Sequence, residues 1–230
     1  MTVRRNIIAA LPVALALILA GCGQPAVTDA EQPSPAQAAM VHLQAEADKG
    51  AAAKADVLLN DPATPVLGNP AGNVTVVEFL DYQCPYCKAA EPRLRALVES
   101  DPNVKLVIKD FPILTPESRV AARAALAAAK QGKYQQLHHA FMDYPGQLTD
   151  TAIMEIARSV GLDTARLRAD MDRPEIQDQI ISNFNLARSL KVTLVPGFVI
   201  GGRVIAGVSA DTETSKIDFP AEVAKARAAP

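Results

Sequence analysis

Two cysteines separated by two residues, in the stretch Cys84-Pro85-Tyr86-Cys87, are the side chains with the clearest capacity for chemistry. A pair at this spacing can contribute to a metal site, form a structural disulfide or exchange electrons with other thiols. A tetrahedral zinc site would need two further ligands, and the sequence contains no second Cys-X-X-Cys pair. His138 and His139 are adjacent within a helical pattern, so we expect them to point apart, as surface and groove residues of that helix. We therefore predict no metal site.

A purely structural disulfide is also disfavoured. Closing a ring of four residues removes only about 2 kcal/mol of unfolded-state entropy, against about 5 kcal/mol for a loop of a hundred residues. The chain has 230 residues and can bury a substantial core without such a bond. A reactive redox pair is the interpretation that remains.

The elements around the pair favour redox chemistry. β-forming residues from Val74 to Leu80 predict a strand, and Cys84-Pro85 is typical of a helix start, with Pro85 at the first helical position. Cys84 would then cap the helix, where unpaired backbone N–H groups and the helix dipole stabilise a thiolate and lower its pKa. Cys87 would lie one turn further in, more buried and able to reach back to Cys84.

The rest of the pattern predicts an α/β fold. A second strand starts at Val104, residues 113–191 carry helical signals without a convincing strand, and residues 196–208 contain two strand-like runs around Gly201-Gly202. A last helix is expected from about Phe219. The order is therefore β-α-β, a helical insertion and β-β-α. It places the cysteines at the carboxyl end of a strand, where α/β folds carry their chemistry.

An acidic residue within the first strand is a second candidate for the site. Alternation places Glu78 on an otherwise apolar face, six residues before Cys84, and a buried carboxylate needs a reason. One reason would be an ion pair with Lys109, at the end of the neighbouring strand. The functional alternative is that Glu78, through water, handles the proton of Cys87.

Val195-Pro196 is a third candidate, because it lies immediately before a predicted strand. Proline is ordinary as the first residue of a strand. A cis bond between these residues would, however, expose the backbone of Val195 for strand-like pairing with a substrate. We predict a cis bond, with Pro196 close to Cys84.

The first residues predict export and membrane attachment. Arg4 and Arg5 precede an apolar run from Ile7 to Ala20, too short to span a bilayer and typical of a secretory signal. Leu19-Ala20-Gly21-Cys22 resembles a bacterial lipobox, in which the cysteine is lipidated; the alternative is an ordinary signal peptide cut nearby. We predict a signal peptide at 1–21, a flexible tether at 22–39, a helical segment at 40–60 and a domain at 61–228, with the helical insertion at about 113–191.

Composition narrows the function classes further. Hydrophobic residues make up 49% of the chain and charged residues 21%, with a net charge of −2, which describes an ordinary globular protein. No basic patch or aromatic-rich strand indicates nucleic acid as a partner. Of three cysteines, Cys22 is assigned to lipid, which leaves one pair in a compartment that permits disulfides.

The chain resembles the DsbA-like branch of thioredoxin-fold thiol–disulfide oxidoreductases, over about residues 56–228. The resemblance rests on "EFLDYQCPYC", on "KDFPIL", on the helical insertion and on "VPGFVIGGRVIAG". It implies a thioredoxin-like fold, with Cys84 as nucleophile and Cys87 as resolving cysteine. It also implies a cis-proline loop at Pro196 facing the pair and a buried acid at Glu78. Pro85, Tyr86 and Val195 are then expected to contact substrate.

One departure from the family pattern concerns the loop before the strand. The family often has glycine two residues before the cis-proline, where this chain has Leu194, and Gly197 follows the proline. The loop that grips substrate is therefore expected to differ in shape. This affects peptide preference more than chemistry.

The predicted function is a thiol–disulfide oxidoreductase, and we expect an oxidase that donates the Cys84–Cys87 disulfide to exported proteins. A reductase or isomerase of the same fold is one alternative, and a lipid-anchored binding or chaperone module without a redox role is another. No cofactor is expected. The expected partners are exported proteins with cysteine thiols, a membrane redox partner that recycles the pair, and the membrane itself through lipid on Cys22. The expected location is the periplasmic side of a bacterial cell envelope.

Overall fold

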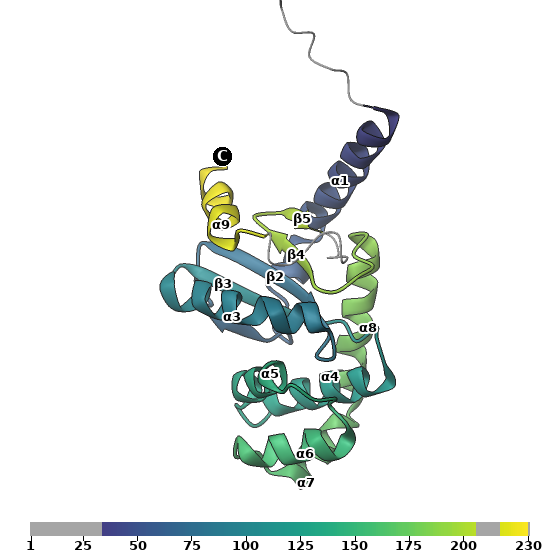
Figure 1. Cartoon of the computed structure of the whole chain (residues 1–230), viewed down its shortest axis with the longest axis vertical. Coiled ribbons are helices and arrows are strands. Elements are labelled where there is room, and N and C mark those ends of the chain that lie inside the picture. Colours follow the sequence, from purple (N-terminus) through teal and green to yellow (C-terminus); the bar gives the residue numbers. More distant parts are fainter. Residues whose placement is uncertain (1–33, 206–216, 230) are drawn as a thin grey trace, which may run out of the picture.

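A mixed sheet forms the centre of the structure, a computed structural model that describes residues 34–205 and 217–229. The predicted signal peptide and the lipidation site at Cys22 lie outside the described residues. Five strands occur in the order β1-β3-β2-β4-β5 (Figure 1). Their bounds are Val66–Gly68 (β1), Val74–Leu80 (β2), Val104–Asp110 (β3), Gly197–Ile200 (β4) and Arg203–Ile205 (β5).

The two central strands, β2 and β3, run parallel and are joined through helix α3, Pro85–Ser100. β4 pairs antiparallel with β2, and β5 continues the hairpin predicted around Gly201-Gly202. Helix α9, Phe219–Ala228, packs beside α3 and against β2 and β4. The predicted β-α-β and β-β-α halves of a thioredoxin-like fold are confirmed.

Strand β1 is an element that the sequence did not predict. It pairs antiparallel with β3, with Leu67 opposite Leu106. Residues 61–73 are rich in proline, glycine and asparagine, and the three strand residues among them are too few to establish an alternation. This strand therefore depends on its hydrogen bonds with the edge of β3 and not on its own sequence pattern.

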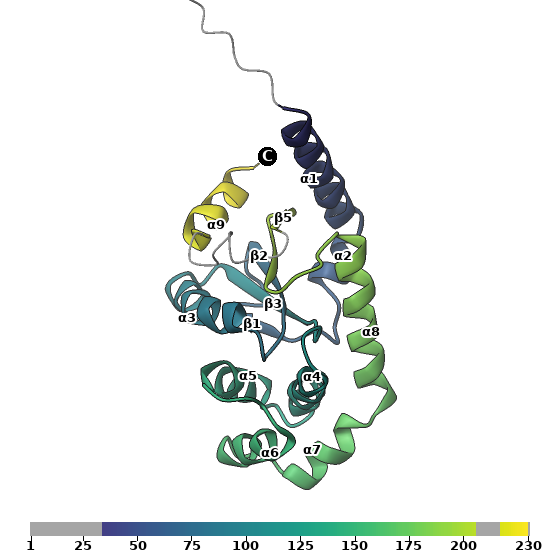
Figure 2. The same cartoon turned by 45° about the vertical axis from the view of Figure 1, so that its right-hand side comes forward.

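All the regular elements between β3 and β4 are helices. It holds α4 (Pro116–Ala129), α5 (Tyr134–Asp143), α6 (Asp150–Ser159), α7 (Thr164–Met171) and α8 (Pro174–Ser189). Helices α4 to α7 gather at one end of the sheet, and α8 runs back along it to β4 (Figures 1 and 2). Helix α4 contacts α5, α6, α7 and α8. Its buried face consists largely of alanines, which allow the other helices to approach closely.

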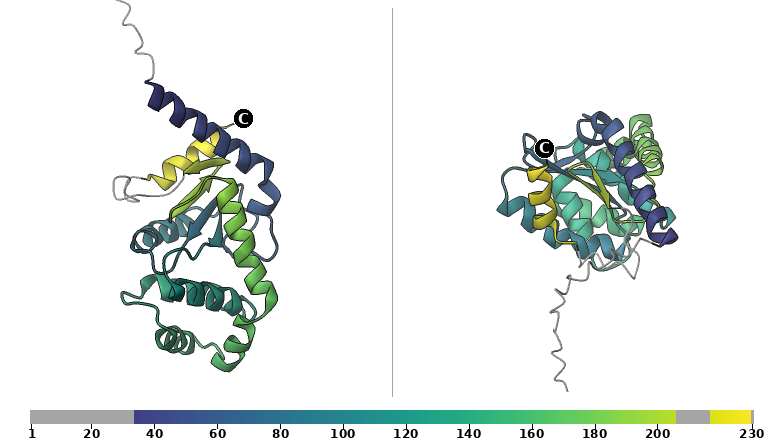
Figure 3. Two further views of the ribbon diagram at one scale, coloured as in Figure 1. Left: turned by 90° about the vertical axis from the view of Figure 1, so that its right-hand side faces the viewer. Right: turned by 90° about the horizontal axis from the view of Figure 1, so that it is seen from above.

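The first described helix, α1, begins earlier than the sequence suggested. It spans Pro35–Ala53, because Ser34 caps it and Gln37 returns the second bond of a capping box. Residues 34–39, which we assigned to the tether, therefore form the cap and the first turn of this helix. Only Ala47 and Ala51 of α1 are buried, and the helix projects from the domain (Figure 3). A short helix, α2 (Ala55–Leu59), follows. Among the described residues, no helix has the length and apolarity needed to cross a bilayer.

Lys109 of β3 is fully buried on the face of the sheet that α2 and α8 cover. Its Nζ donates to the carbonyl of Val57 at 2.9 Å and to Oγ1 of Thr64 at 2.7 Å, and it lies 3.4 Å from Oδ2 of Asp61. Gln179 of α8 donates to the same Asp61 oxygen at 3.0 Å. These contacts neutralise the buried ammonium and connect α8 to the loop before β1.

We expect Asp61→Asn to lower the free energy of unfolding by about 2 kcal/mol, because it leaves the Lys109 ammonium buried without a counter-charge. Denaturant unfolding measures this change. Asp56→Asn, an exposed acid of the same segment, is the control and should change stability by less than about 0.5 kcal/mol. The double variant Asp61→Asn/Lys109→Met should recover most of the loss, and equal instability of the single and double variants would contradict the interpretation.

Candidate active site

The first turn of α3 carries the cysteine pair. Cys84 is the N-cap residue in an extended conformation, and Pro85 follows at the first helical position. The backbone N–H of Cys87 donates to Cys84 Sγ at 3.4 Å. The predicted helix-start placement is therefore confirmed, and the sulfur of Cys84 receives a hydrogen bond that favours its thiolate.

The two thiols, which are not bonded to each other, have opposite pKa shifts. The pKa of Cys84 lies below its usual value, because the hydrogen bond from Cys87 and the backbone N–H groups of Cys87 and Tyr86 together outweigh burial. The pKa of Cys87 lies well above its usual value, because the side chain is fully buried and because it hydrogen-bonds to Cys84. Cys84 is nevertheless only 2% exposed, so it is hardly more accessible than Cys87. The helix start shelters both thiols.

The loop before β4 faces the pair. The bond between Val195 and Pro196 is cis, as predicted. The Cys84 thiol donates to the carbonyl oxygen of Val195 at 3.4 Å, so this carbonyl already has a partner. Gly197 is required because a Cβ there would lie 2.5 Å from Cγ1 of Val192.

Exposed apolar side chains surround this sheltered sulfur. Tyr86 is 37% exposed and Leu194 47% exposed, and Pro85 is exposed between the two cysteines. A pocket of about 350 Å³ lies beside the pair, lined by Gln83, Pro85, Lys88, Thr115 and residues 145–147. The surface around Cys84 therefore combines exposed apolar side chains with a pocket whose lining is both polar and apolar.

Glu78 lies on β2, on the face that α3 covers. It is fully buried, and neither carboxyl oxygen has a hydrogen-bond partner among the described residues. Burial raises its pKa well above the usual value, and the charges of Glu91 and Cys84 raise it further. The ion pair with Lys109 is wrong: Lys109 is in register with Phe79, and successive side chains of a strand point to opposite faces.

Asp110, the last residue of β3, is a buried acid that our sequence reasoning missed. It is in register with Leu80, on the same face as Glu78. Both of its oxygens are buried without a partner among the described residues, and burial, followed by the charge of Asp81, raises its pKa to about 8. The signal that identified Glu78, an acid in an apolar strand, was present here too. We did not use it because strand ends usually carry polar residues.

Asp81 anchors the loop between β2 and α3 and was also missed. Its Oδ1 accepts from the N–H of Gln83 at 2.8 Å. Its Oδ2 accepts from the N–H groups of Ile113 and Leu114 at 2.9 and 3.0 Å. These bonds connect the cysteine loop to the chain that follows β3.

Helix α5 contributes two histidines that we expected to point apart. Both imidazoles instead contact Glu91 of α3: Nε2 of His138 lies 3.2 Å from Oε2, and Nδ1 of His139 lies 2.8 Å from Oε1. His138 is fully buried, not a surface residue. The expectation is wrong because the two ring centroids lie only 5.3 Å apart and a single carboxylate on the facing helix contacts both rings.

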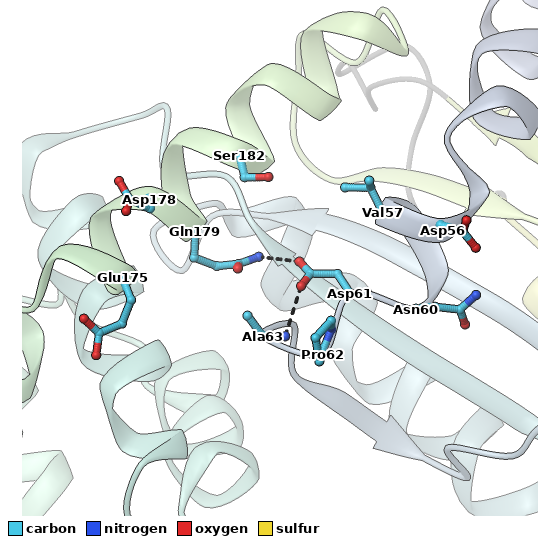
Figure 4. A pocket seen from close by; sticks show the side chains of 10 residues that line it. All are labelled: Asp56, Val57, Asn60, Asp61, Pro62, Ala63, Glu175, Asp178, Gln179 and Ser182. Carbon is cyan, nitrogen blue, oxygen red and sulfur yellow. Dashed lines mark hydrogen bonds between the residues drawn. The ribbon is translucent and has the colours of Figure 1, made fainter.

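A larger pocket, of about 700 Å³, lies away from these residues, between α2 and α8. Figure 4 shows its lining, which includes Asp61 with its bonds to Gln179 and the N–H of Ala63. Asp61 is also the counter-charge of Lys109. The presence of Asp61 in this pocket therefore has a structural reason.

Comparisons with known proteins agree with this geometry. A family model described as a DSBA-like thioredoxin domain matches residues 75–215. The chain belongs to the DsbA-like thioredoxin family. A crystal structure of a thioredoxin-like oxidoreductase from Silicibacter pomeroyi is 46% identical, with a TM-score of 0.71, covering 76% of this chain and 98% of that one.

Two solved structures with lower sequence identity are also similar to this chain. The thiol–disulfide exchange protein α-DsbA2 of Wolbachia pipientis is 27% identical, with a TM-score of 0.69, over 79% of this chain and 95% of that one. The catalytic domain of Proteus mirabilis ScsC is 26% identical, with a TM-score of 0.68, over 79% and 99%.

Curated relatives include proteins that are much longer than this domain. Na(+)/H(+) antiporter NhaA 3 of Salinispora tropica is 31% identical over 140 residues, which are 60% of this chain. The chain spans about a fifth of the length of that antiporter, 22%. The thiol:disulfide interchange protein DsbA of Bordetella pertussis is 27% identical over 60% of this chain and 68% of its own length.

We expect Asp110→Asn to stabilise the protein at neutral pH by about 2–4 kcal/mol and to have little effect at pH 4. Because its folded-state pKa is about 8 instead of 3.8, this acid takes up a proton when the protein folds at neutral pH. Its contribution is therefore fully present below about pH 4 and is lost as the pH rises towards 8. Denaturant unfolding at pH 4, 6 and 8 measures the difference between variant and parent.

The control for Asp110→Asn is Asp178→Asn, which changes an exposed acid of α8. It should leave the pH dependence of stability as it is in the parent. A stability difference between Asp110→Asn and the parent that is the same at pH 4 and pH 8 would contradict the assignment of a raised pKa to Asp110.

Proposed function

We propose that this protein is a thiol–disulfide oxidoreductase that acts on the cysteine thiols of exported proteins. The observation that carries the proposal is the position of Cys84, capping α3, with hydrogen bonds that lower its pKa while the pKa of Cys87 is raised. This asymmetry makes Cys84 a good leaving group and Cys87 a thiol that retains its proton. Relatives named for thiol–disulfide exchange support the same activity.

In the oxidising direction, a substrate thiolate attacks Sγ of Cys84 in the Cys84–Cys87 disulfide. A bond forms between the substrate sulfur and Cys84, and Cys87 leaves as a thiolate. Glu78, buried on the face under α3 and inclined to hold a proton, is assigned to protonate Cys87 through water. A second substrate thiolate then attacks the substrate sulfur, and Cys84 leaves as the stabilised thiolate. The substrate gains a disulfide and the protein retains two thiols.

The substrate backbone is assigned to the loop at Val195-Pro196, with Pro85 and Tyr86 contacting its side chains. Pro85, Tyr86 and Leu194 are exposed around Cys84, whereas Val195 is buried and its carbonyl accepts from the Cys84 thiol. Substrate must therefore displace that thiol contact or pair through other backbone groups of the loop. The pocket beside Pro85 would accept the side chain next to the reacting cysteine of the substrate.

We infer an oxidase because stabilising the Cys84 thiolate stabilises the reduced protein and makes its disulfide a stronger oxidant. A reductase or isomerase would carry the same residues and rest as the dithiol. The reduction potential of the pair separates them: a value near about −120 mV, as for DsbA, supports an oxidase, and one near about −270 mV, as for thioredoxin, supports a reductase. An oxidase also needs a membrane redox partner that takes the two electrons and restores the disulfide.

A binding or chaperone module with an incidental cysteine pair is the rival from another functional class. Insulin reduction and the oxidative refolding of a reduced, unfolded protein distinguish the two. An oxidoreductase should accelerate at least one of these reactions. Failure in both, with the protein supplied first as disulfide and then as dithiol, would contradict the proposal.

We expect Cys84→Ala to abolish both thiol activities, and Cys87→Ala to retain a reactive thiolate and accumulate mixed disulfides, because no internal thiol resolves them. Alkylation of the reduced parent at mildly acidic pH, followed by peptide mapping, should label Cys84 before Cys87. Non-reducing gel electrophoresis detects the mixed disulfides. Labelling of Cys87 first would contradict the assigned order.

We propose that the protein is a lipoprotein that faces the periplasm of a bacterial envelope. Leu19-Ala20-Gly21-Cys22, at the end of the apolar run, supports the lipid. Relatives named as DsbA and as a periplasmic thioredoxin-like protein support the compartment.

We expect Cys22→Ser to move the protein into the soluble fraction or to leave it unprocessed, because no thioether to lipid can form. Detergent partitioning of cell fractions, with the signal sequence otherwise intact, measures this outcome. Partitioning that is unchanged by the substitution would argue against lipidation.

A further inference from the structure

The contact between α3 and α5 contains a cluster that the redox chemistry does not use. Glu91 follows Cys87 by one helical turn, and its carboxylate faces the imidazoles of His138 and His139. We propose that these three side chains bind a divalent transition-metal cation of the zinc type, and that the ion links the active-site helix to the helical insertion. This proposal does not rest on the redox function.

The donor set and its geometry suit such an ion. One atom from each residue can be chosen so that all three lie within 4.8 Å of one another. Zinc bound at about 2.0–2.1 Å by two imidazoles and a carboxylate needs ligand atoms roughly 3.4 Å apart. Nε2 of His138 and Nδ1 of His139 already lie 3.2 and 2.8 Å from carboxylate oxygens. The three chosen atoms lie within 4.8 Å of one another, so binding requires them to approach by at most about 1.4 Å.

The cluster is sheltered but has an approach from solvent. The side chains of Glu91 and His138 are 2% and 0% exposed, whereas that of His139 is 24% exposed. A cavity of about 50 Å³ is lined by Glu91, Arg95, Gln135 and His139, among others. A space of this size holds a water molecule, which would complete a tetrahedral site as the fourth ligand.

The outward nitrogens of both rings have partners. To bind the ion, each imidazole must present a lone pair at the nitrogen that now faces Glu91 and carry its proton on the other nitrogen. Nδ1 of His138 lies 3.1 Å from the hydroxyl of Tyr82, which can accept that N–H while it donates to Tyr134 at 3.2 Å. The amide nitrogen of Gln135 lies 3.4 Å from Nε2 of His139, so on ion binding this amide must turn over to present its oxygen to that N–H. Such outer contacts orient metal-binding histidines.

Arg95 is the group that opposes the ion. Its guanidinium lies 3.1 Å from Oε1 of Glu91 and also contacts Asp143 of α5 at 3.2 Å. Without an ion, the hydrogen bonds to the two imidazoles hold the pKa of this carboxylate well below the usual range, despite burial, and Arg95 adds an ion pair. A divalent cation would take over this role, and Arg95 would keep Asp143. Removing Arg95 should therefore tighten ion binding, an effect that a purely hydrogen-bonded cluster does not predict.

The test uses the full chain in detergent, without a histidine tag and with Cys22, Cys84 and Cys87 replaced by serine, so that no thiol binds metal. Titration calorimetry with ZnCl2 should give one site per chain. His139→Gln should weaken binding at least about tenfold, and Arg95→Gln should tighten it several-fold. His42→Gln is the matched control, because His42 is the remaining histidine of the sequence and lies exposed on α1.

Two further measurements distinguish the loss of a metal ligand from the loss of folding in these variants. Co²⁺ should give visible absorption typical of nitrogen and oxygen ligands in the parent and not in His139→Gln. ZnCl2 should raise the unfolding temperature of the parent and of His42→Gln, but not that of His139→Gln, whose partly exposed side chain can change without emptying the core. Absence of zinc binding, or equal binding in the parent and His139→Gln, would overturn the proposal.

Discussion

The hydrogen bond from the backbone N–H of Cys87 to the sulfur of Cys84 is the interaction on which the site depends. It exists because Cys84 is placed as the cap of α3, so that the free amides of the first turn point at a sulfur. β2 ends just before this turn, the Asp81 contacts hold the connecting loop, and Pro85 begins the helix without needing a donor. Together, the strand, the loop contacts and the proline fix the position of the sulfur of Cys84.

Burial strengthens the hydrogen bond to the sulfur of Cys84, but it also lowers the stability of the protein. In a site of low dielectric constant, amide groups stabilise a thiolate more than they would in water, and a thiol without such donors keeps its proton. Cys84 and Cys87 show the two outcomes within one helical turn. The same environment holds Glu78 and Asp110 without hydrogen-bond partners among the described residues. Folding has to bury these acids in protonated form, which destabilises the protein as the pH rises.

The helical insertion is joined to the redox helix by polar contacts as well as by apolar packing. Tyr82, from the cysteine loop, and Glu91, from α3, both contact His138 of α5. Arg95 and Asp143 add an ion pair between the same two helices. The orientation of α3 is therefore coupled to that of α5, and a ligand bound between them would act on the helix that carries both cysteines.

The sequence by itself determined the local features of this protein. The β-α-β and β-β-α order, the helical insertion, the cap at Cys84 and the burial of Glu78 follow from periodicity, capping residues and spacing, which are properties of neighbouring residues. The cis bond before Pro196 came from resemblance and position. Only the tertiary structure decided the partners across the fold. Lys109 points away from Glu78, towards Asp61, and His138 and His139 meet at Glu91, 47 and 48 residues earlier in the chain. Periodicity tells which face of an element a side chain occupies, but not which residue the packing brings opposite to it.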